Sequence, residues 1–187
     1  MKKIGILGGT FDPPHIGHLI IADEVKSALQ LDKIWFIPTN EPPHKKKAAS
    51  SNEHRLTMLK SMLSTTADFV TNPIEMDRSG KSYTIETIKT LKKQHPDTSF
   101  YFIIGGDMVE YLPKWKQIDE LFQLVQFVGV KRPNYSIETN YPIIEVTVPQ
   151  LDISSTNIKE RVKQQKPFRF FVHDLVYQYI KKERLYE

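Results

Sequence analysis

Short apolar runs alternate with segments of helical periodicity from the first residues onward, and this alternation limits the folds open to the chain. The runs at residues 3–7, 34–37 and 100–104 lack the alternation of apolar and polar residues that is typical of a strand with one solvent-exposed face. Helical spacing of apolar residues follows the first of them, over residues 16–29. Strands buried on both faces and joined by helices form parallel sheets. We therefore expect an α/β protein with a Rossmann-like, doubly wound parallel sheet, helices on both faces and a small helical C-terminal part.

Local signals place the remaining elements. Pro38 ends the strand at residues 34–37, and Ser50 with Glu53 predicts a capping box that opens a helix to about Leu63. No internal repeat, low-complexity stretch or linker is visible, so residues 1–187 are expected to form one domain. Further strands are predicted at residues 69–70, 125–130 and 143–148, and further helices at 83–93, around 108, at 118–124, 155–163 and 173–182.

Composition narrows the class of protein. Of the 187 residues, 40% are hydrophobic and 26% charged, as in globular domains. No apolar run reaches the roughly 20 residues that span a bilayer, so we expect a cytoplasmic protein without a membrane partner. The absence of Cys excludes disulfides, thiolate metal sites and cysteine nucleophiles. The net charge of +4 suits a nucleotide phosphate, weak nucleic-acid affinity or a merely solvated surface, and does not decide among them.

Residues 8–18, GGTFDPPHIGH, are the most informative segment. Paired glycines after a strand let the backbone approach a ligand, and a helix start offers N–H groups and a positive dipole end to phosphate. His15 and His18 are three residues apart, so on a first helical turn they share a face and can donate to phosphate oxygens. The segment has neither the HExxH pattern of a zinc site nor the Gly-Lys-Ser/Thr of a Walker loop. Its parts are common singly, but their combination favours phosphate chemistry.

GGTFDPPHIGH resembles the first motif of the nucleotidyltransferase superfamily, and in this form that of the nicotinate-nucleotide adenylyltransferase family. The resemblance implies transfer of the adenylyl group of ATP to nicotinate mononucleotide, giving deamido-NAD and pyrophosphate in NAD biosynthesis. It also implies a nucleotidyltransferase domain over residues 1–187. No acidic cluster in the sequence resembles a permanent metal site, so Mg²⁺ is expected to arrive with ATP. Four further segments follow in the family's order: 42–45 (PPHK), 82–87 (SYTIET), 105–115 (from GGD to Trp115) and 153–159 (ISSTNIK).

The same resemblance implies roles for individual residues. His15 and His18 would be catalytic and hold the triphosphate, with His18 favoured for stabilising the transition state. Nicotinate mononucleotide would contact Thr10, Tyr83, Thr84, Trp115 and Lys116. ATP and its phosphates would contact Gly8, Gly9, Thr10, Phe11, Lys45, Gly105, Asp107, Ile153, Ser154, Ser155, Thr156 and Lys159.

Some of these residues also have a structural explanation. Residues 154–156 open a helix, so their hydroxyls either cap it or bind phosphate. Asp107 either meets the ribose or caps a helix, and Trp115 either stacks on a flat ring or packs in the core. Asp12 either orients its loop, orients a metal-bound water, or caps the helix that follows.

The segment 153–159 resembles the family's second motif and departs from its usual pattern at one position. Lys159 stands where the family commonly has Arg, and its point charge replaces a guanidinium fork that can bind phosphate at two points. Arg161 lies close by in the sequence and is an alternative donor. The sequence leaves open which of the two contacts phosphate.

Other functions also fit part of the sequence. The nearest is an adenylyltransferase for nicotinamide mononucleotide or phosphopantetheine, which would share the core chemistry. A different class is a non-catalytic nucleotide sensor or RNA-binding module, but no RRM-type aromatic motif and no basic stripe supports it, so no nucleic-acid partner is expected. Phe168, Phe170 and Phe171 either join the core or form the contact of a possible homodimer.

Overall fold

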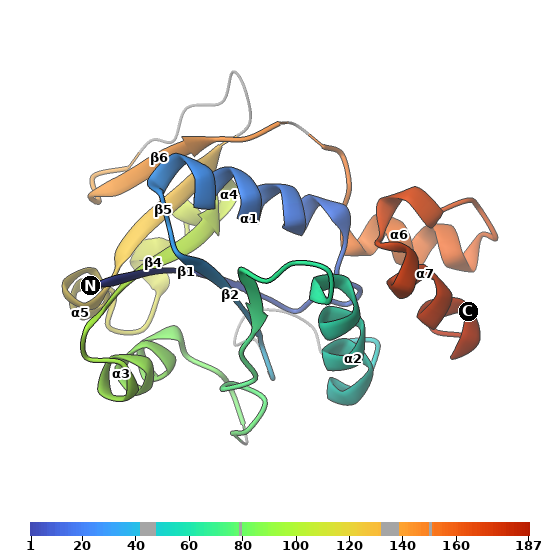
Figure 1. The fold of residues 1–187 in the computed structure, drawn as a ribbon, viewed down its shortest axis with the longest axis horizontal. Coiled ribbons are helices and arrows are strands. Elements are labelled where there is room, and N and C mark those ends of the chain that lie inside the picture. The colour runs from blue at the N-terminus through green and yellow to red at the C-terminus, as the bar shows by residue number, and fades with distance from the viewer. Residues whose placement is uncertain (42–47, 79, 132–138, 150) are drawn as a thin grey trace.

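The structure is a computed structural model, and it describes residues 1–41, 48–78, 80–131, 139–149 and 151–187. Within these residues, six strands form one parallel sheet in the order β3-β2-β1-β4-β5-β6 (Figure 1). This order confirms the predicted doubly wound α/β fold. The strands are β1 (Lys2–Gly9), β2 (Lys33–Pro38), β3 (Phe69–Thr71), β4 (Thr98–Gly105), β5 (Gln126–Lys131) and β6 (Ile143–Thr147).

The helices begin and end close to the predicted positions. One start is corrected: Ser51, and not Ser50, caps the second helix, by accepting the backbone N–H of His54 at 3.2 Å. Ser50 is engaged elsewhere, as described below. The helices are α1 (Ile16–Leu29), α2 (Asn52–Leu63), α3 (Thr84–Gln94), α4 (Gly106–Val109), α5 (Ile118–Leu124), α6 (Ser155–Lys163) and α7 (Asp174–Lys182), with short 3₁₀ turns at η1 (Leu112–Lys114) and η2 (Arg169–Phe171).

Two apolar cores cover the two faces of the sheet. In β1, Ile4 and Ile6 point to the core beneath α3 and α5, whereas Leu7 points to the core shared with α1, α2, α6 and α7. Both faces of the strand are therefore dry, which is why its sequence shows no alternation. In Figure 1, α1 lies on one side of the sheet and α3 on the other.

The direction of strand addition reverses between β1 and β4. Lys2–Leu7 of β1 pairs with Thr98–Ile103 of β4, and both strands end in glycine, at Gly9 and Gly105. The two glycine pairs therefore lie along one edge of the sheet, as the sequence predicts. In such folds, ligands bind in the crevice at this edge, where strand order reverses.

The C-terminal helices gather at one end of the molecule, where α7 packs against α2 (Figure 1). Phe168 is buried in the core, and Phe171 packs against it partly buried, so these two residues serve the core. Phe170 is 85% exposed. Within the described part of the chain, no helix is long and apolar enough to cross a membrane.

Candidate active site

Two cavities flank the turn between β1 and α1, and we name them by one residue each. The Trp115 cavity has a volume of about 330 Å³ and the Ile153 cavity about 380 Å³. Gly105 and Ile21 line both, so the cavities share a wall at the switch point of the sheet. Most predicted site residues line one of them: Gly8, Gly9, Thr10, His18, Tyr83, Thr84, Gly105, Trp115 and Lys116 the first, and His15, Gly105 and Ile153 the second.

The two histidines stand between these cavities. His15 is the N-cap of α1 and His18 lies in its first turn, so their rings stack with centroids 3.7 Å apart. His18 faces the Trp115 cavity and His15 the Ile153 cavity. The backbone N–H of His15 donates to Nδ1 of His18 at 3.1 Å. The i, i+3 spacing thus places the imidazoles on one face, as predicted.

Both imidazoles are neutral at pH 7. Burial lowers the pKa of His15 to about 4. Burial, together with the neighbouring His15, lowers the pKa of His18 well below its usual value. Since Nδ1 of His18 accepts a hydrogen bond, its ring proton lies on Nε2. His18 therefore presents an N–H donor rather than a permanent charge.

Two glycines around the pair leave little room for a side chain. A Cβ at Gly17 would lie 3.0 Å from Nδ1 of His15, and a Cβ at Gly9 would lie 3.1 Å from the Phe11 ring. Phe11 itself is buried, adopts a φ of 50°, and packs edge-on against His18 with centroids 4.9 Å apart. The side chain of Phe11 thus packs behind His18 and lines neither cavity.

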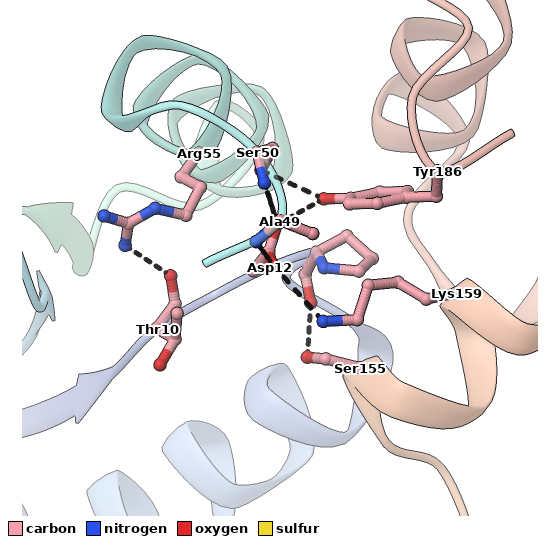
Figure 2. A network of polar contacts seen from close by, with 9 residues as sticks. Thr10, Asp12, Ala49, Ser50, Arg55, Ser155, Lys159 and Tyr186 are labelled. Atoms are coloured by element: carbon pink, nitrogen blue, oxygen red, sulfur yellow. Dashed lines mark hydrogen bonds and ion pairs between the residues drawn. The ribbon is translucent and has the colours of Figure 1, made fainter. Parts of the chain in front are cut away.

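The carboxylate of Asp12 organises the loop between Phe11 and His15. It is 2% exposed and accepts hydrogen bonds from the Ala49 N–H at 2.7 Å, the Tyr186 hydroxyl at 2.8 Å and the Ser50 hydroxyl, while the ammonium of Lys159 lies 3.4 Å away (Figure 2). Burial would raise the pKa of Asp12, but these partners outweigh burial and lower it. Asp12 therefore orients its loop, the first of the three explanations, and does not cap α1.

Arg55 of α2 fixes the preceding residue. Its side chain is 0% exposed, and Nη1 donates to the carbonyl oxygens of Thr10 at 2.7 Å and Thr39 at 2.8 Å. Nη2 donates to Oδ1 of Asn52 at 2.5 Å. A guanidinium can satisfy several carbonyls at once, so one buried side chain ties the end of β1 to the end of β2. Sequence reasoning missed Arg55, because a charged residue in an amphipathic helix is usually solvated.

The second motif reaches the first through the start of α6. The Ser155 hydroxyl donates to the carbonyl oxygen of Pro13 at 2.8 Å (Figure 2), and Ser154 caps α6 by accepting the N–H of Asn157 at 3.1 Å. Arg161 donates to Asn157 at 3.1 Å and to the carbonyl of Pro167 at 2.8 Å. Arg161 is thus occupied within its own segment, whereas Lys159 points toward the first motif.

The far wall of the Trp115 cavity comes from α3 and the turn after η1. Trp115 packs edge-on against Phe102, at a centroid distance of 5.8 Å. Nζ of Lys116 lies 4.4 Å from the centroid of the Tyr83 ring and pairs with Glu86 at 2.8 Å. Tyr83 is the N-cap of α3 and Thr84 its first residue, so a helix N-terminus opens toward this cavity.

A buried acid also lines the Trp115 cavity and has no signal in the sequence. Glu75 accepts the hydroxyl of Thr87 at 2.8 Å, and Thr87 accepts a hydrogen bond from Arg78 at 2.5 Å. Burial raises the pKa of Glu75, against the opposing effect of these partners. Glu75 and Thr87 join α3 to the loop after β3, which fixes the N-terminus of α3 at the cavity.

The remaining predicted residues are Lys45, Asp107, Thr156 and Ser154. Lys45 lies outside the described residues. Asp107 lies inside α4, whose N-cap is Gly105, and its side chain lies outside the described part of the structure. Thr156 and Ser154 line neither cavity.

A resident metal ion would need acidic or histidine side chains placed to ligate it. Among the described residues, no group of three His, Cys, Asp or Glu side chains is placed to hold a metal ion. Asp12, the acid nearest the histidines in sequence, is already surrounded by hydrogen-bond donors and Lys159. These residues do not fit a resident metal centre.

Known proteins resemble the chain over its whole length. The cytidylyltransferase-like family matches residues 6–161. The nicotinate-nucleotide adenylyltransferase of Bacillus subtilis is 48% identical over 188 residues, covering 100% of both chains. A probable nicotinate-nucleotide adenylyltransferase of Geobacillus thermodenitrificans is 55% identical, covering 100% of this chain and 87% of the relative.

The fold also matches a solved structure. Plasmodium falciparum nicotinic acid mononucleotide adenylyltransferase complexed with NaAD superposes with a TM-score of 0.85 at 23% identity, covering 100% of this chain and 98% of the other. That likeness concerns the fold, and the sequence relatives carry the family assignment. By its full-length similarity to them, the chain belongs to the nicotinate-nucleotide adenylyltransferase family.

Proposed function

We propose that this enzyme transfers the adenylyl group of ATP to nicotinate mononucleotide, giving deamido-NAD and pyrophosphate in NAD biosynthesis. The observation that carries the proposal is the stacked His15–His18 pair between two cavities at the switch point of the sheet. Each cavity receives one nucleotide, and their reacting phosphates meet at the imidazoles. Family membership supports the choice of substrates.

The chemistry needs little from the protein beyond position and charge. An oxygen of the mononucleotide phosphate forms a bond to the α-phosphorus of ATP, while the bond from that phosphorus to the α,β-bridging oxygen breaks. The electron pair leaves with pyrophosphate. The attacking phosphate is mostly dianionic near pH 7, so no strong base is required. Catalysis consists of alignment and stabilisation of the developing negative charge.

On the ATP side, the donors come from both motifs. Nε2–H of His18 donates to the phosphate where charge develops, with His15 beside it on the Ile153 cavity. The backbone of residues 8–11 and the start of α6 at residues 154–156 supply further N–H and hydroxyl donors. Lys159 adds a positive charge, and the engagement of Arg161 within its own segment favours Lys159 for this contact. Gly105 and Asp107 at the end of β4 meet the adenosine ribose, and Lys45 reaches the phosphates.

On the mononucleotide side, the Trp115 cavity receives the pyridine ring. Trp115 offers a flat apolar face, and Lys116 and the N-terminus of α3 at Thr84 offer positive potential to a carboxylate. A carboxylate needs such donors, whereas an amide gains less from them. This difference supports nicotinate over nicotinamide as the acceptor base.

Mg²⁺ would enter with ATP as the MgATP substrate rather than bind to a protein site of its own. The acids of the described site do not form a resident centre, and the bound ion supplies further charge neutralisation on the phosphates. The magnesium ion is thus part of the substrate.

Residues 1–187 act as one nucleotidyltransferase domain in this proposal. The chain is also predicted to form a homodimer through the surface around Phe170, which light scattering would test. No nucleic-acid partner is part of the proposal.

Substrate competition tests the assignment. Purified protein is incubated with ATP and, in turn, nicotinate mononucleotide, nicotinamide mononucleotide or phosphopantetheine, with and without Mg²⁺, and pyrophosphate is followed against an ATP-only control. Fast release only with nicotinate mononucleotide and Mg²⁺ is expected. Comparable release with the amide would contradict acid preference, and no release with any acceptor would favour a non-catalytic nucleotide sensor.

A further inference from the structure

Tyr186 lies beyond α7, yet its hydroxyl reaches the centre of the first motif. It donates to Oδ1 of Asp12 at 2.8 Å, and it lies 3.3 Å from Oγ of Ser50, which donates to the same oxygen. Burial raises the pKa of Tyr186, so the phenol stays protonated and remains a donor. Figure 2 shows Tyr186 on one side of Asp12 and Lys159 below it.

The donors of Asp12 fall into two kinds. The Ala49 N–H, the Ser50 N–H and hydroxyl and the Tyr186 hydroxyl are neutral. Among the described residues, the ammonium of Lys159 is the one cation at ion-pair distance, and the buried guanidinium of Arg55 acts on Asp12 only from further away. The lysine contact is also the longest, at 3.4 Å, and its side chain is 27% exposed. A buried carboxylate left without partners is costly, but four neutral donors can keep Asp12 satisfied after the ammonium of Lys159 departs.

We propose that Tyr186 is a positioning residue that allows Lys159 to serve two partners, Asp12 in the free enzyme and the triphosphate in the ATP complex. This inference rests on the proposed function, since it takes ATP as the ligand. The Tyr186 hydroxyl, with Ser50 and Ala49, lowers the cost of separating Lys159 from Asp12. Without that hydroxyl, Asp12 holds the ammonium more tightly, and ATP binds less well.

The placement of the cavities agrees with this exchange. Lys159 lies on α6, whose first residue bonds the carbonyl of Pro13, two residues before His15. Ile153, just before α6, lines the Ile153 cavity together with His15. Lys159 is therefore anchored beside the proposed ATP cavity, and rotation of a flexible side chain is enough to redirect its charge.

The test is a double-mutant cycle on ATP binding. Tyr186→Phe is expected to weaken ATP binding roughly tenfold, near the lower end of the effect of one hydrogen bond to a charged group. The KM for nicotinate mononucleotide stays within about twofold, because its cavity is untouched. In a Lys159→Met background, the same Tyr186→Phe change has no further effect on ATP binding. Ser50→Ala, which removes another neutral donor, acts in the same direction as Tyr186→Phe.

Tyr179→Phe is the matched control. Its hydroxyl lies 2.9 Å from Nδ1 of His54 in the same contact between α7 and α2, without touching Asp12, so ATP affinity should stay as in the wild type. Equal loss on Tyr186→Phe in the wild-type and Lys159→Met backgrounds would show a merely structural role and overturn the proposal. So would unchanged ATP affinity of Tyr186→Phe.

The readout separates this inference from the proposed function. ATP affinity is measured by calorimetry without any mononucleotide, and melting temperatures confirm that each variant is folded. A wild type that binds ATP but releases no pyrophosphate would count against the proposed function alone. The double-mutant cycle on ATP affinity would still test the role of Tyr186. A wild type that does not bind ATP would overturn both.

Discussion

The two walls of the site are built on different principles. The loop of residues 10–15 is fastened by buried groups, above all the Asp12 carboxylate and the Arg55 guanidinium. The Trp115 wall carries an exposed ion pair between Lys116 and Glu86. Buried polar contacts are costly to break, whereas exposed pairs contribute little and adjust readily. The proposed chemistry thus rests on a rigid loop. Recognition of the acceptor base combines the N-terminus of α3, which the buried Glu75–Thr87 contact holds, with a more adaptable edge at Lys116.

The largest effect is expected for His18→Ala. This substitution removes the N–H donor proposed to stabilise the negative charge that develops on the phosphates. The turnover number should fall about 10²- to 10³-fold, as for other preorganised donors, while ATP affinity changes little. Steady-state pyrophosphate release and calorimetry measure the two quantities. His95→Ala, which removes a histidine packed on Trp35, is the control. Unchanged turnover of His18→Ala would remove this residue from its role.

Arg55→Met tests whether the rigid loop depends on its buried guanidinium. It leaves the carbonyls of Thr10 and Thr39 without a donor, so the free energy of unfolding should fall by about 3–5 kcal/mol. Arg55→Lys should recover only part, because an ammonium lacks the planar fork. Urea denaturation measures both against Arg169→Met, an exposed arginine. A loss no larger than that of the control would contradict the contrast.

Acid should loosen the rigid loop through its histidines. The pKa of His15 is lowered to about 4 in the folded state, so between pH 6.5 and 4 the unfolded chain binds more protons. Its contribution to stability is fully present above pH 6.5 and is lost as pH falls toward 4. The slope reaches about 1.4 kcal/mol per pH unit for one such histidine. Urea unfolding at pH 7.5 and pH 5 should show this fall, and His15→Gln should flatten it.

The smallest effect is expected at the adaptable wall. Lys116→Ala should raise the KM for nicotinate mononucleotide by about two- to fivefold and leave the KM for ATP and the melting temperature unchanged. Glu86→Gln frees Lys116 from its partner and provides the comparison. A tenfold loss of turnover in Lys116→Ala would instead place this residue in the chemistry.

Local sequence patterns predict most of this fold. Helical periodicity gives the bounds of α1 and α6 as observed, and unbroken apolar runs give the strands of the sheet. The spacing of His15 and His18 predicts their shared face. These features depend on residues that are close in the chain, so the sequence reports them directly.

The support of the site depends on residues that are distant in sequence. Ser50 was expected to cap a helix, but tertiary contact gives its hydroxyl to Asp12, and Ser51 takes the cap. Arg55 and Tyr186 reach the first motif only after α2 and α7 have packed. No local pattern distinguishes such residues from ordinary surface residues. The roles of Lys45 and Asp107 stay predictions.

The bond between Tyr186 and Asp12 joins residues 174 positions apart in the chain. During synthesis, residues 1–131 can pair β1 with β2 and β4 long before Tyr186 leaves the ribosome. Asp12 gains its full set of donors only after that, since contacts between distant residues form late. A nascent chain should therefore pair the central strands of its sheet first and reach its full affinity for ATP last.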